Sequence, residues 1–296
     1  MSNNPTFALN NLFNVEGWTA VITGGGTGIG LMAAQALANN GARVYITSRR
    51  QDTLAQTVKV HGSSLVHPRG EIIALPLDVT SKQSIADLVQ EISTREKHVD
   101  LLINSAGISK GSSEVEKGDE SPQELSKELG SESVEDWEDV YRTNVIGAFF
   151  TTVAFIPLLS AATQSTHGHS GSVINIASIS GITNTTQHHF KYNVSKAATI
   201  QLNSLLAQEL RRKETKIRVN AISPGIFPSE MTTKESNDQN KSHIPAGEKY
   251  RDEKGIPAGR PGRDEDMAQA VLMLATNQYM SGQNVVVDGG YLLEHP

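Results

Sequence analysis

Cysteine is absent from this 296-residue chain. Its absence excludes disulfide bonds, thiolate catalysis and cysteine-based metal sites together, and it fits a reducing compartment. Basic residues are also few, since 26 Lys and Arg stand against 32 Asp and Glu, for a formal net charge of -6. That balance argues against a nucleic-acid partner.

Long hydrophobic runs are missing as well. The longest are far below the ~20 apolar residues that span a bilayer, and the polar start, residues 1–10, lacks the pattern of a secretory signal. We therefore expect a cytoplasmic protein with no membrane partner. No linker-like stretch divides the chain, and an apolar content of 38% suffices for one large core. We expect an N-terminal tail over residues 1–14 and one domain over residues 15–293.

A glycine-rich turn follows the first apolar strand candidate, residues 18–22. It reads Thr23-Gly24-Gly25-Gly26-Thr27-Gly28-Ile29-Gly30 and leads into a helix-forming stretch. Strand, glycine turn and helix in this order place unpaired backbone N–H groups at a helix N-terminus, which stabilise a pyrophosphate. The spacing differs from the common Gly-x-Gly-x-x-Gly fingerprint, but its context predicts a nucleotide site.

The end of the second strand candidate, residues 43–47, predicts the cofactor. In dinucleotide folds an acid at this point selects a free ribose 2′-hydroxyl, whereas an arginine accommodates a 2′-phosphate. Here the strand runs into Ser48 and Arg49, and no acid is present. These two residues therefore predict NADP(H), with a solvated basic turn as the alternative.

Alternation of strands with helices predicts the fold class. Further strand candidates occupy residues 72–75, 99–103, 173–177, 216–222 and 284–288, with helical segments between them. The pattern predicts an α/β fold, a single-domain Rossmann-type doubly wound parallel sheet of about seven strands with helices on both faces. One long helix should run from about Val134 to Leu159, where Pro157 bends or ends it.

Two polar segments interrupt this alternation. Residues 109–133 are dense in Ser, Glu, Gly and Lys, and we expect a mobile surface insertion. Residues 226–258 are largely polar and lack periodicity, which favours a lid, with a plain surface excursion as the alternative. His188 and His189 have no third ligand at suitable spacing, so we expect no metal.

Tyr192 and Lys196 are the chemical centre of the sequence. Four residues apart, they share one face of a helix, and a positive charge beside a phenol favours the phenolate and lowers its pKa from ~10. Ser178 ends a buried strand, where ligands bind in open α/β sheets. Tyr and Lys at this spacing also occur on ordinary half-exposed helices, and Ser178 is what favours catalysis.

In this order the motifs resemble those of the short-chain dehydrogenase/reductase family, over about residues 15 to 293. They are Thr23-Gly24-x-x-x-Gly28-x-Gly30, Asn104-Ser105-Ala106-Gly107, Asn144, Ser178, Tyr192-x-x-x-Lys196 and Pro224-Gly225. The stretch from Pro224 to Thr232 looks most like that of 3-oxoacyl-carrier-protein reductases of the rhamnolipid-synthesis type. Ser105 departs from the usual second Asn, and Ser229 stands where many members have Thr.

The resemblance implies a role for each catalytic residue. Ser178 would hold the substrate carbonyl, and Tyr192 would donate a proton as the nicotinamide hydride arrives. Lys196 would bind the ribose and lower the pKa of Tyr192, while Asn144 would anchor a water. The implied cofactor contacts are Thr23, Gly24, Gly28, Ile29, Gly30, Ser48, Arg49, Asp78, Val79, Asn104, Ala106, Gly107, Tyr192, Lys196, Pro224, Gly225, Phe227 and Ser229.

These roles predict an NADP(H)-dependent oxidoreductase that transfers hydride between nicotinamide and a ketone or secondary alcohol. A non-catalytic dinucleotide-binding or sensing protein, and a redox-neutral isomerase or cyclase, are the alternatives. We expect a small-molecule substrate, and we expect Phe190, Ile182 and Phe227 near the mouth of the substrate site.

Family members mostly pair through the helices that carry Asn144 and Tyr192. The second of these helices keeps apolar residues at Ile200, Leu202, Leu205 and Leu206. We therefore expect a homo-tetramer, or a dimer.

Overall fold

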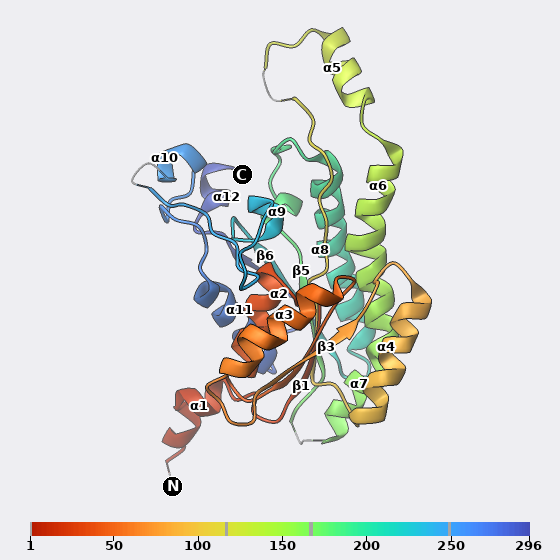
Figure 1. Cartoon of the computed structure of the whole chain (residues 1–296), viewed down its shortest axis with the longest axis vertical. Helices are drawn as coiled ribbons and strands as arrows, with labels where there is room; N and C mark the ends of the chain where they lie inside the picture. Colours follow the sequence, from red (N-terminus) through yellow and green to blue (C-terminus); the bar gives the residue numbers. More distant parts are fainter. Residues whose placement is uncertain (1, 116–117, 166–167, 248–249) are drawn as a thin grey trace.

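Seven parallel strands form a single sheet in the order β3-β2-β1-β4-β5-β6-β7 (Figure 1). The computed structural model describes residues 2–115, 118–165, 168–247 and 250–296. The strands are β1 Thr19–Thr23, β2 Arg43–Ser48, β3 Glu71–Pro76, β4 Leu101–Asn104, β5 Ser172–Ile176, β6 Arg218–Pro224 and β7 Asn284–Val287. Strand order reverses between β1 and β4, which is where such sheets bind ligands. The predicted fold class is confirmed.

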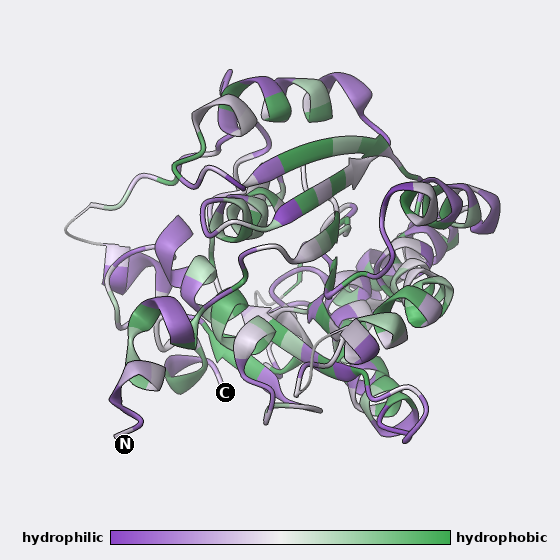
Figure 2. Cartoon of the chain, turned by 90° about the horizontal axis from the view of Figure 1, so that it is seen from below, coloured by the Kyte–Doolittle hydropathy of each residue, from purple (hydrophilic) through white to green (hydrophobic). Residues whose placement is uncertain are grey.

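Alternating strand residues divide the core into two layers. Ala20 and Ile22 pack on one face of the sheet, whereas Val21 packs on the other. The first face is covered by α2 Gly28–Ala38, α3 Gln51–His61 and α11 Asp264–Thr276. The second is covered by α4 Lys82–Arg95, α7 Ala148–Ser165 and α8 Phe190–Leu210. Figure 2 shows the resulting pattern, with hydrophobic strands between helices whose outer faces are hydrophilic.

The predicted long helix is interrupted and extended. It consists of α6 Val134–Tyr141, a π-helical turn over Arg142–Gly147, and α7. The predicted end near Leu159 was wrong, since α7 continues past Pro157 to Ser165, and of the two predicted effects of Pro157 the ending of the helix is excluded. Pro157 lies on the exposed side, where water can bond the carbonyl that loses its helical partner.

This helix also contains a long apolar segment that a search for uninterrupted apolar runs does not find. By length and composition alone, the stretch Val134–Ser165 is able to cross a membrane. That test is weak evidence, because core helices of soluble proteins also pass it, and α7 packs on β4, β5 and α4.

The segment 109–133 contains a helix that the sequence analysis did not predict. This helix is α5, Pro122–Gly130, and it begins with a capping box in which Ser121 and Glu124 satisfy each other's backbone N–H groups. In Figure 1, α5 stands apart from the sheet, beyond the N-terminal end of α6.

Packing continues beyond the predicted domain end at residue 293. The chain finishes with α12 Tyr291–Glu294, and the carbonyls of His295 and Pro296 accept hydrogen bonds from Thr183 Oγ1 (3.1 Å) and Asn184 N (3.3 Å). The remaining short elements are the 3-10 turns Asn4–Phe7, Gly62–Ser64 and Ile179–Gly181 and the helices α1 Leu9–Leu12, α9 Glu230–Thr233 and α10 Tyr250–Lys254.

Candidate active site

The glycine turn closes tightly on the neighbouring strand end. Gly24 has a left-handed φ of +68°, and a Cβ there would lie 2.9 Å from the Cα of Ala106. A Cβ on Gly30 would lie 2.3 Å from the carbonyl oxygen of Gly24. Thr23 Oγ1 accepts hydrogen bonds from the backbone N–H groups of Ser105 and Ala106, both at 3.1 Å. The ends of β1 and β4 are thereby locked together at the point where the strand order reverses.

The first turn of α2 presents unpaired donors beside this turn. Thr27 is its N-cap and makes no side-chain capping bond, while Gly28 and Ile29 form the first helical residues. The N–H groups of such a turn have no partner within the helix and suit a phosphate. A Cβ on Gly28 would approach Ser229 Cβ at 3.0 Å, so the two predicted contact loops meet here.

Ser48 and Arg49 lie at the carboxyl end of β2, as predicted. Ser48 Oγ accepts a hydrogen bond from Arg50 N (2.9 Å), which places the hydroxyl at the start of α3. Arg49 is exposed. The pKa of Asp78 is lowered even though burial opposes the shift, because Thr80 donates two hydrogen bonds and Arg49 adds its charge. Asp78 and Arg49 therefore border the same volume at the ends of β2 and β3.

Asn104 belongs to a chain of buried amides that sequence reasoning missed. Its Nδ2 donates to Thr152 Oγ1 and Asn175 Oδ1, both at 2.9 Å, and Asn175 Nδ2 donates to Asn203 Oδ1 (3.1 Å). The Oδ1 atom of Asn104 is buried and makes no hydrogen bond within the described residues. The signal available in the sequence was Asn175, a polar residue near the end of β5, which pairs with Asn104.

The π-helical turn carries Asn144 into the site. A π turn inside an α-helix often marks a functional position, because its extra residue shifts the side chains that follow. Asn144 Oδ1 accepts from Ile108 N (2.8 Å), and its Nδ2 donates to Ile108 O and to Ser195 Oγ, both at 3.0 Å. A Cβ on Gly107 would lie 3.3 Å from Asn144 Oδ1 and 3.6 Å from Lys196 Nζ. The absence of a side chain at Gly107 leaves room beside both groups.

Ser178, Tyr192 and Lys196 meet at the ends of β5 and α8. Burial raises the pKa of Tyr192 to about 12, against the opposing effect of its hydrogen bond with Ser178. Burial also lowers the pKa of Lys196 to about 8, and its Nζ donates to Ile176 O at 2.8 Å. Lys196 Nζ lies 5.6 Å from the centre of the Tyr192 ring. The predicted lowering of the Tyr192 pKa is thus not found, because desolvation of the phenol outweighs its hydrogen bond with Ser178.

The loop after β6 differs from its prediction at one residue. Pro224 ends the strand, and Gly225 N donates to Val287 O (2.9 Å), so both predicted contacts lie at the carboxyl edge of the sheet. Phe227 is buried in the core, 2% exposed, and a Cβ on Gly262 would overlap its ring. Its side chain therefore packs inside the protein, whereas the sequence analysis expected it near the substrate mouth.

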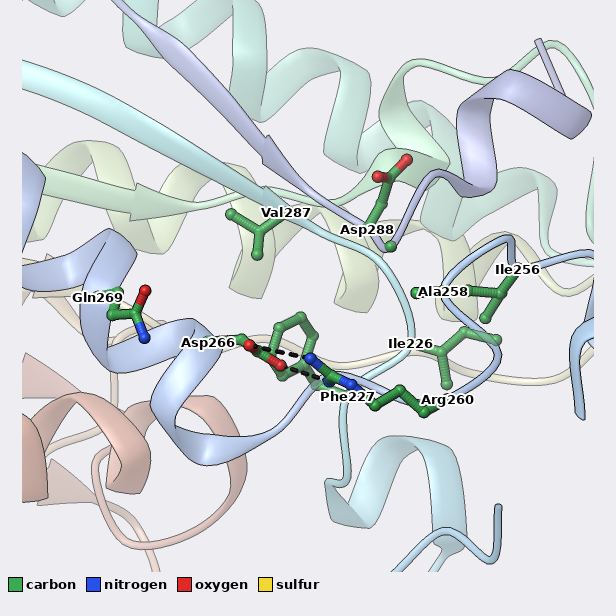
Figure 3. A pocket seen from close by; sticks show the side chains of 11 residues that line it. Ile226, Phe227, Ile256, Ala258, Arg260, Asp266, Gln269, Val287 and Asp288 are labelled. Carbon is green, nitrogen blue, oxygen red and sulfur yellow. Dashed lines mark hydrogen bonds and ion pairs between the residues drawn. The ribbon is translucent and has the colours of Figure 1, made fainter. Parts of the chain in front are cut away.

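A cavity of about 260 Å³ opens behind this loop (Figure 3). Phe227, Ile256 and Val287 line it, and Arg260 forms a two-pronged ion pair with Asp266 at 2.6 and 3.2 Å beside it. None of the lining residues is Ser178, Tyr192 or Lys196, so the cavity is separate from the catalytic group.

The segment 109–133 is fastened to the start of α8, next to Tyr192. Buried Lys191 pairs with Glu132 (3.4 Å), and Glu132 also accepts hydrogen bonds from Ser113 and Trp137. One backbone hydrogen bond, from Ser113 N to His188 O (2.9 Å), joins the segment to the residues before α8. The sequence analysis did not predict these contacts, because a lysine beside a tyrosine gives no signal of burial.

Metal-ligating side chains do not gather anywhere in the described ranges. Among residues 2–115, 118–165, 168–247 and 250–296, no group of three His, Asp or Glu is placed to hold an ion.

Known proteins share this architecture along the whole chain. A family model described as short chain dehydrogenase matches residues 18–240. A short-chain dehydrogenase/reductase from Diaporthe leptostromiformis, PhomF, is 35% identical and covers 99% of this chain and 97% of its own. The rhamnolipids biosynthesis 3-oxoacyl-[acyl-carrier-protein] reductase of Pseudomonas aeruginosa is 34% identical over 95% and 98%.

Solved structures give the same result. The RhlG/NADP active-site complex of Pseudomonas aeruginosa superimposes with a TM-score of 0.75 at 33% identity, over 95% of this chain and 98% of that one. The NADPH-dependent 3-quinuclidinone reductase of Rhodotorula rubra has a TM-score of 0.73 at 25% identity, over 99% and 96%. Extent, identity and fold agree, and the chain belongs to the short-chain dehydrogenase/reductase family.

Proposed function

We propose that the protein is an NADP(H)-dependent carbonyl reductase. The observation that carries this is the meeting of Ser178, Tyr192 and Lys196 beside the strand-order reversal. Two relatives with NADP in their descriptions, the RhlG/NADP complex and the quinuclidinone reductase, support the cofactor choice. The reductases among the relatives support a ketone substrate, of 3-oxoacyl or secondary-metabolite type.

The residues fit a dinucleotide. The glycine turn excludes side chains where a pyrophosphate would approach, the first turn of α2 offers donors, and buried Asn104 Oδ1 offers an acceptor. Bound nicotinamide would supply the hydride, which is the cofactor's own chemistry. Lys196, with Nζ beside Gly107, would hold the nicotinamide ribose.

Tyr192 is suited to protonate the substrate oxygen. A phenol with a pKa of about 12 is fully protonated at neutral pH, as a proton donor must be. Hydride arrival makes the carbonyl oxygen an alkoxide, which is more basic than a phenolate, so proton transfer from Tyr192 is downhill. Ser178, already bonded to Tyr192, directs a second donor to the same oxygen. Donors aimed at the developing charge stabilise the transition state more than the ground state.

Asn144 would support reprotonation of Tyr192. Its side chain joins Ile108 to Ser195, and Ser195 Oγ donates to Tyr192 O at 2.7 Å. This frame fixes the first turns of α8, which carry Tyr192 and Lys196. Asn144 therefore positions the catalytic pair and stands where a water could reach Lys196.

The direct test is incubation with NADPH and a panel of ketones, followed at the absorbance band of reduced nicotinamide. We expect NADPH oxidation that depends on both ketone and enzyme. Binding of NADPH without turnover of any ketone would favour the non-catalytic alternative.

The pH profile should differ between the two directions. Oxidation of an alcohol needs the Tyr192 phenolate, whose fraction rises about tenfold per pH unit below a pKa of about 12. Ketone reduction needs the phenol, which stays protonated over the same range. We expect alcohol oxidation to accelerate from pH 7 to 9 while ketone reduction does not. Initial rates in both directions at saturating cofactor test this, and oxidation that slows with rising pH would contradict it.

The protein should form a homo-tetramer, with a dimer as the alternative. The residues that support assembly differ from those predicted. Of the four predicted apolar residues on α8 only Leu205 is exposed, and Leu206 is 7% exposed. The large apolar side chains exposed on α6, α7 and α8 are Val134, Trp137, Tyr141, Phe149, Val153, Val194 and Leu205.

Because α6 contacts α8, these residues form a surface that a second copy could cover. We expect Val153→Asp to lower the mass found by light scattering, whereas Val66→Asp, at another exposed valine, should not. A wild-type mass near 32 kDa at micromolar concentration would contradict assembly.

We also propose that the enzyme is cytoplasmic. Its domain would cover residues 15–293 together with the packed C-terminal residues that follow.

A further inference from the structure

Glu230, the first residue of α9, holds Arg50 in a two-pronged ion pair. Arg50 Nη1 and Nη2 donate to Glu230 Oε1 and Oε2 at 3.2 and 2.6 Å. Ser236 Oγ also donates to Glu230 Oε1 (2.8 Å). Arg50 is the main reason why the pKa of Glu230 is lowered, followed by opposing burial and by the bonds from Ser236 and Thr27. The carboxylate is therefore a bound anion, held by several donors from three parts of the chain.

The position of this anion is the reason for interest. Thr27 is the N-cap of α2 in the glycine turn, and Arg50 follows Arg49 at the end of β2. By the strand-end rule, a ribose 2′-phosphate is recognised at this point. An arginine fork bonds a carboxylate and a phosphate in the same geometry, and it cannot give the same two bonds to both at once.

The chain beyond α9 is anchored separately, on α3. Buried Asn240 donates to Thr53 O (2.9 Å) and Thr57 Oγ1 (2.8 Å), and Gln56 donates to Asp238 O (2.7 Å). Before α9, Gly225 is bonded to β7. Phe227 is buried and Ile226 O accepts a hydrogen bond from Gly262 N (2.9 Å), so residues 228–237 cross the glycine turn between two fixed points. The Glu230 to Arg50 pair lies between these points. We therefore restrict the lid predicted over residues 226–258 to this crossing segment.

We propose that Glu230 competes with the cofactor's 2′-phosphate for Arg50, so that loading NADP(H) detaches α9 from the end of β2. This inference rests on the proposed NADP(H) dependence and assigns Glu230 as a residue that sets cofactor preference. Arg49 would remain the first partner of the phosphate, and Arg50 would join it when Glu230 leaves. NADH has no 2′-phosphate and leaves the ion pair in place.

Binding titrations of NADPH and NADH, followed by calorimetry, test the competition without relying on turnover. Glu230→Gln removes the competing charge and should tighten NADPH binding by roughly two- to fivefold, within the range for a partly exposed ion pair. NADH binding should change less than about twofold. Glu235→Gln, which neutralises the neighbouring exposed carboxylate, is the control and should leave the NADPH to NADH ratio unchanged. In Glu230→Gln combined with Arg50→Met, the gain should disappear.

Hydrogen exchange of residues 230–236 gives a second readout. Saturating NADPH should accelerate exchange there, whereas NADH should not. If Glu230→Gln leaves the affinity ratio unchanged, or NADPH slows exchange in this segment, the inference is wrong. Equal wild-type affinity for both cofactors would overturn the proposed NADP(H) preference instead. If the wild-type affinities are equal, a gain in NADPH affinity alone in Glu230→Gln would still support the competition. No gain in NADPH affinity would then overturn both the competition and the NADP(H) preference.

Discussion

Replacing Tyr192 with phenylalanine is expected to lower kcat for ketone reduction by at least ~10²-fold, because general acid catalysis contributes ~10²- to 10⁴-fold. The phenyl ring keeps the packing of the half-buried tyrosine and removes only the hydroxyl that bonds Ser178. NADPH binding should stay nearly intact. Kinetics with one ketone, beside a binding titration, separate the two effects.

The matched control is Tyr279→Phe. Tyr279 is fully exposed, so the same substitution there should leave both kcat and NADPH affinity at the wild-type level. A Tyr192→Phe enzyme with more than a tenth of wild-type activity would show that another group supplies the proton.

Replacing Arg49 with aspartate should erase or reverse a preference for NADPH over NADH of at least tenfold in kcat/KM. A charge-assisted bond to the 2′-phosphate corresponds to roughly 10- to 150-fold in preference. Aspartate would repel that phosphate, and it could accept a bond from the free 2′-hydroxyl of NADH. Two steady-state titrations with one ketone give the ratio for each variant.

Arg69→Asp makes the same charge change at the other end of the sheet. Arg69 precedes β3 and pairs with Glu16 (2.9 Å), so its loss should not alter the cofactor ratio. Equal efficiency with both cofactors in the wild type, or an unchanged ratio in Arg49→Asp, would mean that Arg49 is only a solvated turn residue.

The sequence was sufficient for the sheet, because a doubly wound fold repeats one local pattern. Runs such as 72–75 are apolar on both faces of the sheet, and the glycine turn lies between a strand and a helix, which limits the topology. Asn144, Ser178, Tyr192 and Lys196 could be selected because short motifs at fixed order carry them. The structure brings Ser178 and Tyr192 into contact and Lys196 beside the ring.

What could not be predicted depends on burial and on contacts distant in sequence. Lys196 was expected to lower the pKa of Tyr192, but desolvation of the phenol dominates. Phe227 was expected near the substrate mouth and Leu206 on a face for assembly, yet both are buried, since a single apolar residue in a loop or helix does not reveal which side it faces. The pairing of Arg50 with Glu230 joins residues 180 positions apart, for which no local pattern exists.

The central claim is that hydride passes from nicotinamide to a carbonyl carbon under the control of Tyr192. Its most direct measurement uses NADPH deuterated at C4 on the transferred face and a ketone that the panel identifies, with the product analysed by mass spectrometry. The account predicts one deuterium on the carbinol carbon with wild-type enzyme and at least ~10²-fold less labelled product per unit time with Tyr192→Phe. Alcohol without deuterium from either C4 epimer of the labelled cofactor, or equal labelling rates in both enzymes, would contradict it.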